Sequence, residues 1–230
     1  MSAKITSINY CPVKSVSFQS VENCKIKKNI GIIGDRIFAF AKDLDLEQAK
    51  LFEKSPAERK GKWNKVLTLK NSPALNKYNF IFKDEKLTLT FKDNEILSID
   101  INQLTEREAL SNKISELESS LKQPITLMKN DAFPFFDTSI SKKVDFVNSV
   151  SLLNFQSIND FEKKVSKKIE TSIFRGNICI DGLEPWKERE WIGKTIKINN
   201  VSFKVEKNIP RCVAINLKPK TDDNSFNLLQ

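Results

Sequence analysis

Residues 79–101 read NFIFKDEKLTLTFKDNEILSIDI, and this stretch decides the class of the fold. It contains three β-rich runs, over residues 79–83, 86–92 and 96–101. The turn-forming pairs Asp84-Glu85 and Asp93-Asn94 separate them. Alternating apolar runs joined by such short connections are typical of antiparallel strands. The stretch therefore predicts an antiparallel meander in a protein rich in β-structure.

Other β-rich runs lie on both sides of this meander. They occupy residues 5–10, 21–27 and 36–41 before it, and residues 125–128, 173–181, 195–198, 201–205 and 212–217 after it. Asn199-Asn200 is a turn signal, so the runs on either side of it predict a hairpin.

Helical patterns interrupt these strands. A short helix is expected over residues 46–54, after Asp45 as a cap. A longer one is expected over residues 104–122, where apolar side chains are spaced by three and four and where Thr105 and Glu108 have capping-box spacing.

A further helix is expected to open at Ser157, and its apolar face comprises Ile158, Phe161, Val165 and Ile169. Strands outnumber helices along the chain, so the pattern predicts a mixed, β-dominated α+β fold.

The composition excludes several classes of enzyme. The chain of 230 residues contains no histidine, which rules out Ser-His-Asp hydrolases and His-based metalloproteases. Its cysteines, Cys11, Cys24, Cys179 and Cys212, are far apart and form no C-x-x-C pair. The sequence therefore argues against a zinc ribbon, an iron–sulfur site or a dithiol redox motif.

The net charge of +9 raises the question of an anionic partner. Basic residues are scattered among acidic ones, and Phe80, Phe82 and Phe91 fit a strand core better than a stacking surface, so nucleic acid binding by a basic β-barrel is the less favoured alternative. The N-terminus lacks an apolar leader and no run is long enough to span a bilayer. We expect a cytoplasmic monomer with reduced thiols that does not bind membranes.

Five short motifs follow one another along the chain. They are PVKS at residues 12–15, GDR at 34–36, VSLLN at 150–154, FRGNI at 174–178 and RCVA at 211–214. In this order and spacing, the chain resembles the MOSC domain proteins, named for the C-terminal domain of molybdenum cofactor sulfurase and including the amidoxime-reducing component.

The resemblance implies an architecture. It predicts an N-terminal β-barrel-like MOSC subdomain over residues 1–100, packed on a MOSC β-barrel with flanking helices over residues 101–230. Members of the family usually continue past the position of Gln230 into closing strands. The resemblance thus leaves open a truncated product, a fragment or a divergent member with an open sheet edge. We expect residues 221–230 to pack poorly.

The resemblance also assigns Cys212 as the family's cysteine. A thiolate is a soft ligand that suits molybdenum already held by the two dithiolene sulfurs of its cofactor. Arg211 beside it would favour the thiolate form and contribute to the cofactor site. From the residues alone, a buried free thiol acting as a small hydrophobe is the favoured interpretation of Cys212.

Arg175 lies in an otherwise apolar run and needs an anionic partner. A pterin phosphate suits its planar fork, with Gly176 allowing close approach of the backbone and Asn177 supplying polar contacts. An ion pair with Asp181 or Glu190 is the structural alternative.

The resemblance raises further polar residues to cofactor anchors: Lys14, Ser15, Arg36, Asn148 and Ser149. Without it, the first three are ordinary solvated side chains, and the last two precede a helix whose N-terminus favours an anion or simply needs a cap. We expect Cys212, Arg175, Lys14 and Arg36 to share one pocket.

The functional expectation is a molybdenum-cofactor-binding oxidoreductase. It would act on a small N- or O-containing substrate with electrons from a separate redox protein. The alternative is a sulfur carrier with a persulfide on Cys212. Pyridoxal phosphate is associated with fused members of the family, but no lysine here has a context that marks it for a Schiff base.

Overall fold

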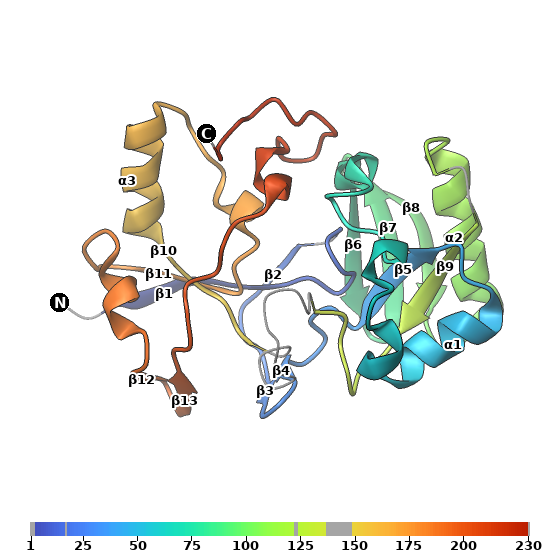
Figure 1. Ribbon diagram of the computed structural model, residues 1–230, viewed down its shortest axis with the longest axis horizontal. Coiled ribbons are helices and arrows are strands. Elements are labelled where there is room, and N and C mark those ends of the chain that lie inside the picture. Colours follow the sequence, from blue (N-terminus) through green and yellow to red (C-terminus); the bar gives the residue numbers. More distant parts are fainter. Residues whose placement is uncertain (1–2, 17, 122–123, 137–148, 230) are drawn as a thin grey trace.

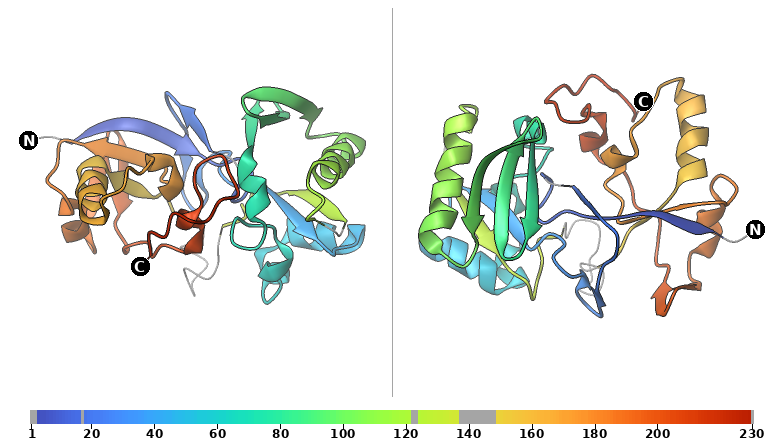
Figure 2. Two further views of the ribbon diagram at one scale, coloured as in Figure 1. Left: turned by 90° about the horizontal axis from the view of Figure 1, so that it is seen from above. Right: turned by 180° about the vertical axis from the view of Figure 1, so that it is seen from behind.

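The structure is a computed structural model that describes residues 3–16, 18–121, 124–136 and 149–229. Two groups of elements lie side by side, and all views separate them (Figures 1 and 2). We call the group that contains helices α1 (Leu46–Lys54) and α2 (Leu104–Leu117) the meander lobe. We call the group that contains helix α3 (Phe155–Val165) the α3 lobe. Mixed α+β structure is confirmed.

The meander lobe is built on the stretch that decides the fold class. Strands β6 (Tyr78–Lys83), β7 (Lys86–Phe91) and β8 (Asn94–Asp100) form an antiparallel three-stranded sheet in that order, as predicted. Both hairpins turn through residues with positive φ, including Asp84 at 51° and Asp93 at 65°. The inward faces bury Phe80, Leu87, Leu89 and Ile99 in the main core.

A second sheet in this lobe pairs β5 (Phe38–Lys42) with β9 (Ile125–Lys129) in antiparallel register. Helices α1 (Leu46–Lys54) and α2 (Leu104–Leu117) pack on β9 (Figure 1). The Asp45 cap is confirmed, since its carboxylate accepts a hydrogen bond from the Gln48 amide at 2.8 Å.

The predicted start of α2 at residue 104 is confirmed, but its predicted capping box and its predicted end at residue 122 are wrong. Gln103 is the cap and gives no side-chain bond, while Glu106, not Glu108, turns back to accept from the Asp100 amide at 2.6 Å. The helix ends before Glu118 because the Glu118 carboxylate turns inward and accepts from the Tyr78 hydroxyl at 2.8 Å. Burial and this contact raise the pKa of Tyr78.

The α3 lobe centres on a four-stranded sheet in the order β10-β11-β1-β2. These strands are β10 (Leu152–Asn154), β11 (Ile178–Asp181), β1 (Lys4–Tyr10) and β2 (Gln19–Val21). β10 runs parallel to β11, and β1 runs antiparallel to β11 and β2. The N-terminal strand is therefore a central strand of the lobe that also holds the last third of the chain.

Helix α3 (Phe155–Val165) covers this sheet. It begins earlier than Ser157 because Asn154 is its cap and accepts from the Gln156 amide at 3.1 Å. The predicted hairpin is confirmed as β12 (Thr195–Ile198) and β13 (Val201–Lys204).

Three expected strands are wrong in whole or part. Residues 21–27 hold only the end of β2 and the short β3 (Ile26–Lys27), which pairs with β4 (Gly31–Ile32). In the run expected over residues 173–181, the first two residues belong to the 3-10 helix η6 (Thr171–Phe174) and the backbone bends at Arg175. Strand β11 therefore starts only at Ile178. Residues 212–217 form the 3-10 helix η8 (Val213–Asn216) instead of a strand.

The other 3-10 helices of the described residues lie in connections. They are η1 (Pro56–Arg59), η2 (Trp63–Lys65), η3 (Pro73–Lys77) and η7 (Lys187–Trp191). Among the described residues, no helix is long and apolar enough to cross a membrane.

The expected barrels and loose tail are not what the structure shows. Within the described ranges the strands form separate sheets of two to four strands, and none of them closes into a barrel. Leu228 is 5% exposed and packs with Ile169 and Ile215, so the end of the chain is held against the α3 lobe. The Leu228 amide donates to Asn216 Oδ1 at 2.8 Å. Apolar side chains near the end of the chain therefore complete a small core without forming a strand.

Each lobe combines elements from both sides of residue 100. β9 pairs with β5 in the meander lobe, and β1 pairs with β11 in the α3 lobe. The division into units 1–100 and 101–230 stays a prediction.

Candidate functional site

Two backbone segments run beside each other where the chain passes from the α3 lobe to the meander lobe. They are residues 11–15, after β1, and residues 35–38, which lead into β5. The Arg36 amide donates to the Cys11 carbonyl at 2.6 Å, and the Lys14 amide donates to the Phe38 carbonyl at 2.8 Å. This pairing brings the side chains of Lys14 and Arg36 into the surroundings of Cys11.

Asp35 is the carboxylate at the centre of this arrangement and is 1% exposed. It accepts hydrogen bonds from the Cys11 amide at 2.7 Å, from Asn177 Nδ2 at 3.2 Å and from the Arg36 guanidinium. A buried carboxylate is tolerated only when its oxygens are satisfied in this way. Asp35 therefore fixes the position of Arg36 and links the two lobes through Asn177.

Arg175 reaches the same place from the α3 lobe. Its backbone is left-handed, with φ 51°, at the end of η6. Its Nη2 lies 2.9 Å from the Cys11 sulfur. The structure thus brings Arg175 and Arg36 to the same thiol, while a pocket shared with Cys212 and the role of these side chains as anion ligands stay predictions.

The structure explains Gly176 by packing against Leu153, whereas the sequence suggested a close approach of the backbone to a ligand. A Cβ at this position would lie 2.4 Å from Leu153 Cδ1, so any larger residue would have to displace the Leu153 side chain on β10. The glycine serves close packing behind Arg175, and no approach of a ligand is needed to explain it.

Asn177 supports the site from behind. Its Oδ1 accepts from the Ser151 amide at 3.1 Å and from the Ser151 hydroxyl at 2.9 Å, and its Nδ2 donates to the Asn9 carbonyl at 3.1 Å and to Asp35. Because its amide is fully engaged inside the protein, its expected direct contact with a cofactor is not needed to account for it.

The charges around Cys11 are predominantly positive. Burial raises the pKa of the Cys11 thiol, and the nearby Asp35 carboxylate raises it further. The cations Arg175, Arg36 and Lys14 lower the same pKa, but burial outweighs them and the net shift is upward. Burial alone would lower the pKa of Arg36, but Asp35 raises it more. The site therefore places three basic side chains and one carboxylate around a buried thiol, and this excess of positive charge suits an anion.

Lys14 and Arg36 are also supported by aromatic rings. Lys14 is 6% exposed, and its Nζ lies 5.6 Å from the centre of the Trp63 ring. The Arg36 guanidinium lies 5.0 Å from the centre of the Phe136 ring. Neither side chain is the solvated surface charge that the sequence alone suggests.

Cys212 is in a different setting. It is exposed and caps η8. Arg211 ties this segment to the turn before Arg175, since its Nη1 donates to the Phe174 carbonyl at 3.0 Å and its guanidinium stands over the Phe174 ring. Burial lowers the pKa of Arg211. The thiol among the cations is Cys11. Cys212 follows Arg211, which contacts the residue before Arg175.

The remaining expected site residues, Ser15, Ser149 and Asn148, differ in exposure and in whether the structure describes them. Ser15 is half-buried with φ 65°, beside Lys14, and Ser149 is exposed. Asn148 lies outside the described residues. The two acids considered as partners of Arg175 have other contacts, Asp181 with Gln156 and Glu190 with Lys187.

Asn9, Cys11 and Asp35 were not among the expected site residues. Asp35 belongs to the GDR motif, so its position in the chain is a usable signal. Cys11 directly precedes the PVKS motif, which marks it as the rival thiol near the expected pocket. Asn9 has no such signal, because it is placed by its pairing with Asn177.

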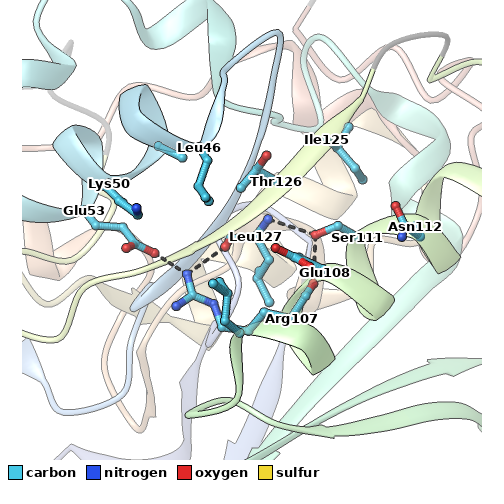
Figure 3. Close-up of a pocket in the computed structure, with 12 residues that line it drawn as sticks. Leu46, Lys50, Glu53, Arg107, Glu108, Ser111, Asn112, Ile125, Thr126 and Leu127 are labelled. Carbon is cyan, nitrogen blue, oxygen red and sulfur yellow. Dashed lines mark hydrogen bonds and ion pairs between the residues drawn. The ribbon is translucent and has the colours of Figure 1, made fainter.

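A separate hollow of about 410 Å³ lies between α1 and α2 at the outer edge of β9 (Figure 3). Its polar side chains already satisfy that edge: Arg107 donates to the Leu127 carbonyl and pairs with Glu53, and Ser111 accepts from the Leu127 amide. They cover an otherwise open strand edge. Lys14, Arg36 and Arg175, which we call the cation cluster, are not among the residues that line this hollow.

Comparison with known proteins finds a matching family and a distant relative. Residues 143–228 match the model of the MOSC domain family, so this part of the chain is similar to a MOSC domain. The mitochondrial amidoxime reducing component 2 of Bos taurus is 28% identical to it over 92 residues. The match covers 40% of this chain and 27% of that relative. Arg175, Asn177, Arg211 and Cys212 lie within the matched domain, whereas Lys14 and Arg36 precede it.

Proposed function

We propose that this protein binds the molybdenum cofactor and uses it as an oxidoreductase. Lys14, Arg36 and Arg175 would hold the phosphate of the pterin, and Cys212 would offer its thiolate to the metal. The observation that carries the proposal is the convergence of these three cations around the buried Cys11 thiol. Ser15, Ser149 and Arg211 would add contacts at the rim.

The residues present fit such a group. Guanidinium forks and an ammonium are the usual partners of phosphate oxygens. Within the described ranges there is no group of three or more His, Cys, Asp or Glu side chains that could hold a metal. The proposal asks the protein for a single soft ligand, because the cofactor brings its own sulfur atoms.

When bound, the molybdenum centre would supply the redox chemistry on a small N- or O-containing substrate, with electrons from a separate redox protein. The chain's own part is to hold and orient. Asp35 fixes Arg36, Asn177 fixes Asp35, and the packing of Gly176 on Leu153 fixes the bend that presents Arg175.

A second candidate function is sulfur transfer through a persulfide on Cys212. The observation that favours it is the exposure of this thiol, which a sulfur donor can reach directly. Metal content distinguishes the two candidates.

The test is Cys212→Ser with Cys24→Ser as the matched control, both expressed in a host that makes the cofactor. If Cys212 ligates molybdenum, its loss should abolish turnover and reduce molybdenum while leaving most of the pterin, because the phosphate contacts remain. The Cys24 variant should match the parent in both. Full turnover by the Cys212 variant would remove this residue from the mechanism, and loss of labile sulfur without loss of metal would favour the carrier.

A further inference from the structure

Arg59 is the largest side chain that is wholly enclosed in the protein, at 1% exposure. It stands at the end of η1, and its Nε donates to the Phe52 carbonyl at 2.8 Å. Its Nη1 donates to two consecutive carbonyls, of Phe133 at 2.8 Å and of Pro134 at 3.1 Å. The guanidinium also stacks over the Phe135 ring, with 4.0 Å between them. Arg59 thus fastens residues 133–136 to the end of α1.

The segment that Arg59 holds is the one that supports Arg36. The Phe135 amide donates to the Arg36 carbonyl at 2.7 Å. The Phe136 ring lies 5.0 Å from the Arg36 guanidinium. One residue of the segment therefore fixes the backbone of Arg36, and the next supports its side chain.

We infer that Arg59 is a positioning residue for the anion site and acts on Arg36 through residues 133–136. The inference rests on the proposed function, since it assigns Arg59 a part in orienting one of the three cations. Arg59 itself makes no contact with Arg36 among the bonds and ring contacts described.

The choice of arginine supports this role. A lysine ammonium is a single point of charge, whereas the guanidinium fork reaches carbonyls on two segments while its face covers a ring. Among the described residues Arg59 forms no ion pair and its Nη2 has no hydrogen-bond partner. Burial lowers the pKa of Arg59 to about 10, which still leaves it charged at neutral pH. A buried cation without a contacting carboxylate lowers the stability of a fold, so stability alone does not explain Arg59. The geometry of its guanidinium instead matches the carbonyls and the ring of residues 133–136.

A double-mutant cycle tests the inference on the full chain, with inorganic phosphate as the probe in titration calorimetry. The single variants are Arg59→Lys, which keeps the charge and loses the fork, and Phe136→Leu, which removes the ring beneath Arg36. Lys60→Gln, an exposed neighbour, controls for a general change in charge. Melting temperatures are recorded for all of them.

We expect each of the two single variants to weaken phosphate binding about tenfold, and the double variant to be little weaker than either, because both act on the same guanidinium. Lys60→Gln should bind like the parent. If Arg59→Lys does not fold, the inference still requires the loss in Phe136→Leu.

Two results would overturn it. In the first, either Arg59→Lys lowers the melting temperature but binds phosphate as the parent does, or the double variant loses affinity by the product of the two single losses. The anion site then stands, and only the role of Arg59 fails. In the second, the parent binds no phosphate, and the proposed function fails together with the inference.

Discussion

At the scale of single residues, the site depends on Asp35. This carboxylate accepts hydrogen bonds from the Cys11 amide and from the Asn177 side chain, and it pairs with Arg36. Its motif was visible in the sequence, but its burial was not. Burial follows from contacts between segments that are over 140 positions apart, and a local pattern carries no record of them.

Asp35→Asn should be strongly destabilising, because it removes the counter-charge of a largely buried arginine. We expect the free energy of unfolding to fall by about 3 kcal/mol. Denaturation with urea measures this, with Asp131→Asn, an exposed acid, as the control. Equal midpoints for the Asp35 variant and the parent would show that the carboxylate is not the centre of the site.

At the scale of elements, prediction succeeded where the local signal was complete. The meander has alternating side chains and two turn pairs, and α1 has its cap, so both appear where expected. Residues 212–217 are as apolar as a strand, yet they find no partner strand and form η8. The run at residues 173–181 is broken by the bend at Arg175, and this bend creates the site.

The bend at Arg175 can be tested through its neighbour. Gly176→Ala would place a methyl group 2.4 Å from Leu153 Cδ1 and should cost about 1–3 kcal/mol of unfolding free energy. Shortening the opposing side chain in Gly176→Ala/Leu153→Ala should recover part of the phosphate binding lost in the single variant, because the bend can return to its place. No recovery would mean that this contact does not set the position of Arg175.

At the scale of the whole molecule, two lobes meet at the cation cluster, and the end of the chain completes the core of one of them. Sequence patterns indicated the class of fold and most elements of the meander lobe. The pairing of β1 with β11 and the docking of the tail are long-range events that required the structure.

The docked tail predicts unequal effects at adjacent leucines. Leu228 is buried beside Ile169 and Ile215, so Leu228→Ala should lower the free energy of unfolding by about 2–4 kcal/mol. Leu229 is 46% exposed, and Leu229→Ala should stay within about 0.5 kcal/mol of the parent. Similar values for the two variants would indicate that the tail does not dock as described.

The central claim is that cations from both lobes hold one anionic cofactor. The most direct measurement is the amount of pterin and molybdenum that co-purifies with the protein from a host that makes the cofactor, compared among the parent, Arg175→Met and Arg189→Met. Arg189 is an exposed arginine in the same lobe and serves as the matched control. We predict that the parent and Arg189→Met carry pterin and metal in equal amounts and that Arg175→Met loses both about tenfold or more. Undiminished pterin in the Arg175 variant, or none in the parent, would contradict the claim.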